Sequence, residues 1–269
     1  MSGRLANKVA IITGAGSVGP GWGNGRAAAV AFAREGAHVF AVDLEAEAMA
    51  ETVALATEAA CHGGEIRTYT ADLTDDAQVA AMAAACVAAW GRVDILVNNV
   101  GAAAKGGAVA LSEADWDRQI VLNLKSVFLG CRHVIPLMQV AGGGAIVNTA
   151  STNGIRYTGA PQVAYASAKA GVIQFSRVTA VEYAPHHIRV NTVVPGLMHT
   201  PMVEAKLAGQ RTGGDVAALL QSRLARIPLG FMGDGRDTAA AVLFLASDEA
   251  RFITGTEIII DGGMSARCD

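Results

Sequence analysis

This chain of 269 residues has few cysteines and little net charge, and both shortages exclude classes of protein. Its four cysteines are Cys61, Cys86, Cys131 and Cys268. They are scattered without the spacing of metal ligands, so we expect reduced thiols and no metal site. A formal charge of −3 and an isoelectric point near 6.1 offer no electrostatic basis for binding nucleic acid or an anionic membrane.

Long hydrophobic runs are also missing. No stretch approaches the roughly 20 uninterrupted apolar residues of a transmembrane helix. The apolar run Val9–Ile12 is too short for the core of a signal peptide, and it leads directly into Thr13-Gly14. We therefore expect a soluble protein of the cytoplasm.

The chain is rich in hydrophobic residues, which make up 52% of it and suffice for a large core. It also contains 31 glycines, which suit tight turns. Short β-branched runs alternate with alanine-rich amphipathic stretches. The runs predict strands at Val9–Ile12, His38–Val42, Ile66–Thr70, Ile95–Val97, Ala145–Thr149, Arg189–Val194 and Ile258–Ile260. The stretches predict helices at Gly25–Arg34, Ala46–Ala60, Asp75–Trp90, Ser112–Met138, Ala164–Ala184 and Arg236–Ala246. Thr74 and Ser112 are the expected N-caps of two of these helices.

This alternation predicts an α/β fold with a doubly wound, Rossmann-like parallel sheet of about seven strands and helices on both faces. We find no repeat and no linker, so residues 1–269 are expected to form a single domain. One irregular region, about residues 196–235, has a helical centre near Val216–Ala225 and is expected to be a substrate lid. Its arginines Arg211, Arg223 and Arg226 are interpreted as solvated surface, with contact to an acidic substrate as the alternative.

A glycine-rich turn follows the first predicted strand, from Thr13-Gly14 to Gly23-Asn24-Gly25. Glycines allow backbone N–H groups to approach a pyrophosphate, and the N-terminus of the following helix adds a favourable dipole. Asp43 ends the next strand, where a carboxylate accepts hydrogen bonds from an adenosine ribose. Asp43 would repel a 2′-phosphate, and Leu44 supplies no compensating cation. The turn and Asp43 together predict a dinucleotide site that prefers NAD over NADP.

Tyr165 and Lys169 lie four residues apart in a stretch of helix formers, so both side chains project from one helical face. A free tyrosine titrates at about 10 and is a poor base at neutral pH. An ammonium group one turn away favours the phenolate and makes the tyrosine a usable acid/base. Many such pairs are ordinary helix surface, and the nucleotide site upstream is what favours a catalytic role.

In its ordered set of motifs the chain resembles the short-chain dehydrogenases/reductases over essentially its whole length. The matching motifs are the glycine-rich turn, Asp72-Leu73, Asn98-Asn99-Val100-Gly101, Asn123, Ser151 after Ile146–Ala150, Tyr165-x-x-x-Lys169, Pro195-Gly196-Leu197-Met198-His199-Thr200, and Thr254-Gly255 with Asp261-Gly262-Gly263. The resemblance implies hydride transfer between a nicotinamide cofactor and a small alcohol or ketone. It also implies a homotetramer in which the helices ending near Met138 and Ala184 pair between subunits.

The resemblance also implies a role for each catalytic residue. Tyr165 exchanges a proton with the substrate oxygen, and Ser151 holds the same oxygen. Lys169 lowers the pKa of the tyrosine and binds the nicotinamide ribose. Asn123 supports a water-linked proton relay behind Lys169.

A second set of residues is implied to hold the cofactor. Asp72 and the Leu73 backbone meet the adenine, and Asn99 lies near a ribose. Gly14 and the Asn24 backbone lie beside the phosphates. The residues implied to orient the nicotinamide carboxamide are Pro195, Met198 and Thr200.

The first turn departs from the family pattern, because eight residues lie between Gly14 and Gly23, which leaves Ser17–Trp22 as a lengthened loop. A Gly-Trp-Gly stretch in such a loop is similar to the enoyl-thioester reductase branch, which reduces C=C bonds. That branch spaces its tyrosine and lysine seven apart and lacks the serine, so the four-residue spacing with Ser151 favours alcohol and ketone chemistry. An enoyl reductase and a non-catalytic dinucleotide sensor remain the alternatives.

Overall fold

A seven-stranded parallel sheet organises the structure, a computed structural model that describes residues 3–207, 209, 213 and 215–268. Its strands are β1 (Val9–Thr13), β2 (His38–Asp43), β3 (Ile66–Thr70), β4 (Ile95–Asn98), β5 (Gly144–Thr149), β6 (Ile188–Pro195) and β7 (Glu257–Ile260). They lie in the order β3-β2-β1-β4-β5-β6-β7, and every neighbouring pair is parallel. This confirms the predicted doubly wound, Rossmann-like sheet. The strand order reverses direction between β1 and β4, and ligands of such sheets bind outside the carboxyl ends of the strands at that point.

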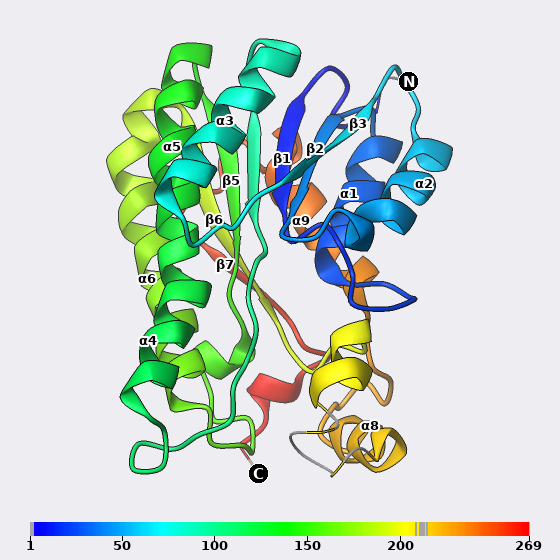
Figure 1. The fold of residues 1–269 in the computed structure, drawn as a ribbon, viewed down its shortest axis with the longest axis vertical. Helices are drawn as coiled ribbons and strands as arrows, with labels where there is room; N and C mark the ends of the chain where they lie inside the picture. Colours follow the sequence, from blue (N-terminus) through cyan, green and yellow to red (C-terminus); the bar gives the residue numbers. More distant parts are fainter. Residues whose placement is uncertain (1–2, 208, 210–212, 214, 269) are drawn as a thin grey trace.

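Helices cover both faces of the sheet (Figure 1). The main helices are α1 (Asn24–Arg34), α2 (Ala50–Ala59), α3 (Asp76–Trp90), α4 (Glu113–Ile120), α5 (Ser126–Ala141), α6 (Val163–Tyr183), α8 (Val216–Leu224) and α9 (Gly235–Ala246). In Figure 1, α1, α2 and α9 lie on one side of the sheet and α3 to α6 on the other, while α8 lies apart at the lower end with the C-terminus.

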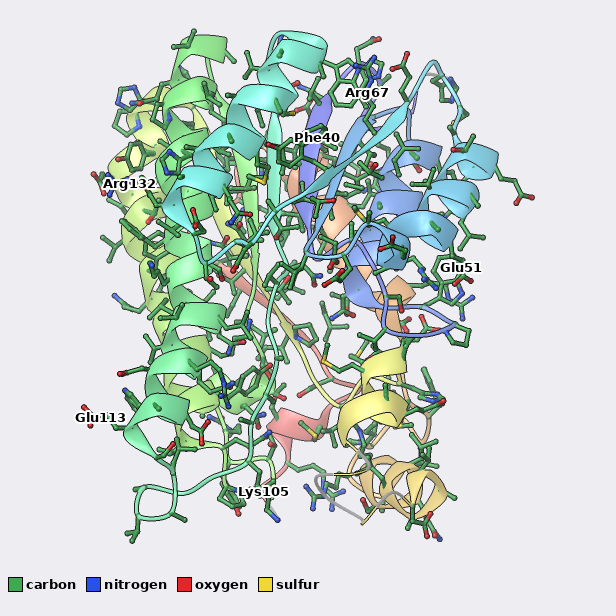
Figure 2. The ribbon with its side chains drawn as sticks, viewed as in Figure 1. Phe40, Glu51, Arg67, Lys105, Glu113 and Arg132 are labelled. Carbon is green, nitrogen blue, oxygen red and sulfur yellow. The ribbon has the colours of Figure 1, made fainter. Side chains whose placement is uncertain are left out.

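Two apolar clusters fill the spaces between the sheet and its helical layers. One joins α1 and α9 to the sheet around Phe32 and Leu245. The other joins α3, α5 and α6 to the opposite face around Phe40 and Met138. Figure 2 shows Phe40 among these layers, whereas Glu51, Arg67 and Arg132 project from the periphery. Because both faces are covered, the central strands β1 and β4 are buried along their whole length rather than at alternate positions.

Strand ends are tied together beneath the site by an amide network. The Asn98 side chain at the end of β4 donates to Asn148 Oδ1 on β5, at 2.9 Å. The Asn148 amide in turn donates to the Ser176 hydroxyl of α6, also at 2.9 Å. These buried hydrogen bonds fix the carboxyl ends of β4 and β5 relative to α6, where the site lies.

Two helical predictions need correction. Thr74 does not cap α3, because the Asp75 side chain accepts from Gln78 N and Thr74 instead bonds to Asp72. Ser112 is a cap as predicted, accepting from Asp115 N. The predicted helix from Ser112 to Met138 is not one regular α-helix, since a π-helical stretch, Val121–Lys125, separates α4 from α5.

The continuous helical span Glu113–Ala141 is long and apolar enough to cross a membrane by length and composition alone. Core helices of water-soluble proteins pass the same test, and here α5 packs against α3, β4 and β5.

Candidate active site

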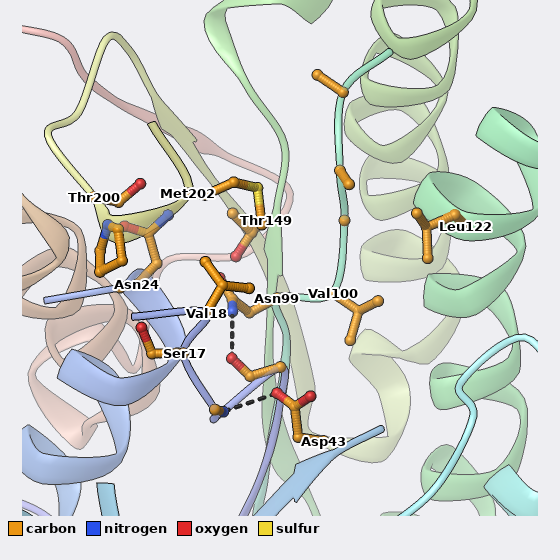
Figure 3. Close-up of a pocket in the computed structure, with 18 of the residues that line it drawn as sticks. Ser17, Val18, Asn24, Asp43, Asn99, Val100, Leu122, Thr149, Thr200 and Met202 are labelled. Atoms are coloured by element: carbon orange, nitrogen blue, oxygen red, sulfur yellow. Dashed lines mark hydrogen bonds between the residues drawn. The ribbon is translucent and has the colours of Figure 1, made fainter. Parts of the chain in front are cut away.

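The glycine-rich turn after β1 forms the first wall of a cavity at the carboxyl ends of the strands. Gly14 has a positive φ of +64°, and a Cβ on Gly25 would overlap the Gly14 carbonyl oxygen, so both positions require glycine. The Asn99 amide donates to that carbonyl at 3.1 Å. Asp43 Oδ2 accepts from Gly16 N at 2.8 Å. Figure 3 shows these last two bonds, which join the turn to the ends of β4 and β2.

The lengthened loop Ser17–Trp22 is held from both sides. Arg26, only 2% exposed, donates to the Gly21 carbonyl at 2.7 Å and pairs with Glu51. On the other side, Gly235 N of α9 donates to the Trp22 carbonyl at 3.1 Å. Atoms of Pro201 lie within 3.6 Å of a Cβ placed on Gly21, so the loop meets the segment that follows β6.

Acidic and apolar residues form the wall at the ends of β2 and β3. Asp43 lines the cavity with its neighbours Leu44 and Glu45, and Asp72 lines it with Leu73. Among the described residues of the lining, the cations are Lys169 and Arg223, and neither belongs to this wall. The region around Asp43 therefore carries negative charge.

Tyr165 and Lys169 enter the cavity from the first two turns of α6, as the four-residue spacing predicts. The Lys169 Nζ atom lies 5.8 Å from the centroid of the Tyr165 ring and donates to the Thr149 carbonyl at 2.8 Å. Lys169 is 2% exposed, and burial lowers the pKa of its ammonium group from 10.5 to about 8. Ser151 follows β5, caps a short 3-10 turn and lines the same cavity.

Asn123 lies behind Lys169 and is not part of the cavity lining. Its fully buried side chain accepts from Ala102 N and donates to the Ala102 carbonyl, each at 3.1 Å. It also donates to the Gln119 carbonyl of α4 at 3.0 Å. A Cβ on Gly101 would lie 2.7 Å from Asn123 Oδ1 and 3.1 Å from Lys169 Nζ. Asn123 thus holds the segment after β4 against Lys169, and it sits in the π-helical stretch, a feature frequent at functional sites.

One cavity of about 640 Å³ is lined by all the other catalytic and cofactor-binding residues that are predicted from the sequence. They are Gly14, Asn24, Asp43, Asp72, Leu73, Asn99, Ser151, Tyr165, Lys169, Pro195, Met198 and Thr200. In Figure 3, Asn24 and Thr200 lie on one side of this cavity and Val100 and Leu122 on the other. Within the part of the chain that the structure describes, no three His, Cys, Asp or Glu residues are grouped as metal ligands.

Several lining residues were missed by sequence reasoning, among them Leu122, Met202 and Val203. No sequence pattern marks such apolar positions, because only the fold brings them to the cavity. The interpretation of Arg223 as solvated surface is wrong: its side chain is buried, lines the cavity and donates to the Met198 carbonyl. Arg226 is exposed, as expected, and Arg211 lies outside the described residues.

Comparisons with known proteins show the family to which this chain belongs. A family model described as enoyl-(acyl carrier protein) reductase matches residues 20–265. The 3-oxoacyl-(acyl-carrier-protein) reductase FabG of Thermotoga maritima is 40% identical, over 97% of this chain and 99% of its own length. The chain belongs to the short-chain dehydrogenase/reductase family. D-threitol dehydrogenase of Mycolicibacterium smegmatis is 41% identical over 98% of this chain and 95% of its own length.

A solved structure of the same family type extends the comparison to three dimensions. The crystal structure of a Burkholderia xenovorans protein of short-chain dehydrogenase/reductase type is 63% identical, with a TM-score of 0.95. It covers 99% of this chain and 100% of the Burkholderia chain.

Members of the family bind a nicotinamide dinucleotide, and the residues of this short-chain dehydrogenase/reductase fit that cofactor. Gly14, Gly16, Gly23 and Gly25 line the cavity and form a cradle in which none of these residues places a side chain between the backbone and a ligand. Asn24 lines the cavity at the first residue of α1, and its buried Oδ1 has no hydrogen-bond partner among the described residues. A buried amide oxygen without a partner is costly, and a ligand in the cradle would satisfy it.

Proposed function

We propose that this protein is an NAD-dependent oxidoreductase that interconverts a secondary alcohol and a ketone, with Tyr165 as the acid/base. The observation that carries the proposal is the convergence of Tyr165, Lys169 and Ser151 in one cavity with the glycine-rich cradle. The relatives support the reaction class, since one is named as a 3-oxoacyl reductase and another as a D-threitol dehydrogenase.

The chain's own residues perform the proton half of the reaction. When bound, the nicotinamide would accept a hydride in oxidation and donate one in reduction. The Tyr165 phenolic oxygen takes the proton of an alcohol during oxidation and returns it to the carbonyl oxygen during reduction. The Lys169 ammonium beside the ring favours the phenolate form through its positive charge. The Ser151 hydroxyl holds the same substrate oxygen and stabilises its developing charge.

NAD is proposed over NADP because of the charge around Asp43. Its carboxylate and that of Glu45 line the cavity together, and both would repel a 2′-phosphate. Asp72, Leu73 and Asn99 complete the adenosine side, while the roles of Pro195, Met198 and Thr200 at the nicotinamide follow the family pattern. Asn123 is proposed to position Lys169 and its proton relay.

Residues 1–269 are proposed to act as one cytoplasmic domain in which about residues 196–235 form the substrate lid. Of that segment, residues 208, 210–212 and 214 lie outside the described part. A homotetramer is proposed because α5 and α6 expose large apolar side chains. These are Phe128, Val140, Val178 and Val181.

The test is NADH formation over a panel of secondary alcohols, cyclic diols and sugars, for the wild type and for Tyr165→Phe. We expect Tyr165→Phe to abolish turnover while the NAD dissociation constant changes less than threefold. Tyr157→Phe is the matched control, because Tyr157 is 77% exposed and lies outside the cavity lining. Retained turnover in Tyr165→Phe would refute the mechanism.

The description of the matching family model supports enoyl-thioester reduction as a second candidate function. The presence of Ser151 and the four-residue spacing from Tyr165 to Lys169 argue against it. NADH oxidation with a short enoyl thioester, in the absence of turnover of any alcohol or ketone, would establish the second candidate instead.

A further inference from the structure

Arg223 places a buried cation in the wall of the cavity that the proposed lid segment contributes. It lies in the last turn of α8, and its side chain is only 6% exposed. Its Nη2 atom donates to the Met198 carbonyl at 3.0 Å, across 25 residues of sequence. This hydrogen bond holds the guanidinium at the cavity wall beside the segment that follows β6.

The part of the cavity lining that follows β6 contains several apolar side chains. Met198, Met202 and Val203 line the cavity together with Arg223. Val203 also packs against Leu219 of α8, the helix that carries Arg223. In a pocket of this kind, a few polar groups in an apolar wall determine which ligand binds and in what orientation. A charged donor there acts at low dielectric, where its interaction with an anion is stronger than in water.

The charges of the cavity are separated along the sheet. The carboxylates Asp43, Glu45 and Asp72 follow β2 and β3, whereas Met198, to which Arg223 is bonded, follows β6. Four inter-strand steps separate β2 from β6 in the sheet order, which amounts to roughly 19 Å. Ser151 follows β5, the immediate neighbour of β6. The positive end of the cavity is therefore the end at which the substrate hydroxyl would lie.

We propose that Arg223 binds a carboxylate on the substrate, so that the enzyme acts on secondary hydroxy acids and their keto acids. The guanidinium presents its N–H donors in a planar fork that matches the two oxygens of a carboxylate. The hydroxyl group of such a substrate lies at Tyr165 and Ser151 while its carboxylate lies at Arg223. This assignment rests on the proposed alcohol/ketone reaction and names the substrate class for that site.

The test compares acids with their own neutral esters. The probes are hydroxy acids whose secondary hydroxyl lies two, three or four carbons from the carboxyl group, each with its methyl ester, assayed with NAD on the wild type, Arg223→Met and Arg223→Lys. For at least one acid, we expect the wild type to prefer the acid over its ester by at least tenfold in kcat/KM. Arg223→Met should lower kcat/KM for that acid roughly 10- to 100-fold, the range expected when a charged hydrogen bond is removed, and lower it less than threefold for the ester. Arg223→Lys keeps the charge and should restore part of the preference.

Arg226→Met is the matched control, because Arg226 is exposed, lies outside the cavity lining and donates to the Thr158 carbonyl at 2.6 Å. It should leave the preference for acids unchanged. An equal loss for acid and ester in Arg223→Met would show that Arg223 only anchors α8 to Met198, and would overturn the proposal. A wild type that turns over neutral alcohols at least as well as every acid would also overturn it while leaving the alcohol/ketone reaction intact.

A binding measurement keeps the proposal testable if no alcohol is turned over. Calorimetric titration of the NADH-bound protein with the corresponding keto acids should give at least tenfold tighter binding to the wild type than to Arg223→Met. The keto esters should bind both proteins equally. Wild-type protein that binds no keto acid more tightly than its ester would refute the carboxylate site, whatever reaction the enzyme performs.

Discussion

The buried ammonium group of Lys169 should make the stability of the protein rise with pH in a defined window. Burial lowers the pKa of this group from 10.5 to about 8, and unfolding restores the ordinary value. Between these two values the unfolded chain binds more protons than the native protein, so the free energy of unfolding increases with pH. The destabilisation is complete below about pH 8 and is gone above pH 10.5.

The magnitude follows from the same two values. A fall from 10.5 to about 8 corresponds to about 3 kcal/mol of destabilisation well below pH 8. Integrating the proton-linkage relation from about pH 7 to about pH 9.5 returns about 2 kcal/mol of it. Lys169→Met carries no titrating group at this position, so that gain should be missing from the variant.

The measurement is urea unfolding of the cofactor-free protein at about pH 7 and about pH 9.5, at one fixed protein concentration. The difference between wild type and Lys169→Met isolates Lys169, because the other titrating groups are common to both. Lys125→Met is the matched control, since Lys125 is exposed and donates to the Thr74 carbonyl at 3.1 Å. It should keep the wild-type gain. The same pH dependence in wild type and Lys169→Met would refute the reasoning that Lys169 is destabilised by burial.

Three further changes test the site. Gly101→Ala places a Cβ 3.1 Å from Lys169 Nζ. It should lower kcat at least tenfold while the NAD dissociation constant changes less than threefold. An unchanged kcat would contradict the close packing of Gly101 against Lys169. Asp43→Asn removes the charge that disfavours a 2′-phosphate. The ratio of kcat/KM for NADP⁺ to that for NAD⁺ should therefore rise at least tenfold. An unchanged ratio would show that Asp43 does not select the cofactor. Arg26→Met removes the charged hydrogen bond to the Gly21 carbonyl. The loss should lower the free energy of urea unfolding by about 2 kcal/mol and speed NADH release in stopped-flow fluorescence. Equal release rates would show that the lengthened loop does not retain the cofactor.

The strands were predictable because their signal is local. Runs such as Val9–Ile12 and Ile95–Val97 are bounded by polar residues. The observed strands differ from all seven predictions by no more than one residue at either end. Helix termini were less predictable, because Thr74 and Asp75 are both good caps by composition. Asp75 is the cap because its carboxylate reaches Gln78 N.

The residues of the site likewise divide into those predictable from local sequence and those that only tertiary packing places. Residues in local motifs, such as Tyr165 with Lys169, were predicted because one helical turn brings them together. Asn123 was predicted to act behind Lys169, but its bonds to both backbone groups of Ala102 depend on the packing of α4 and α5 against the segment after β4. The contact between the Ser17–Trp22 loop and Pro201 joins segments about 180 residues apart, and no spacing rule reaches that far.

By itself the sequence determined the sheet, the glycine-rich cradle and the presence of a tyrosine–lysine pair, because each depends on residues that are neighbours along the chain. Only the tertiary structure decided the environment of the charges. Lysine and arginine usually lie at the surface, but Lys169 and Arg223 are both buried beside one cavity because distant segments close around them. Burial is a property of those distant contacts, and it is burial that lowers the pKa of Lys169 and places the charge of Arg223 where a substrate would meet it.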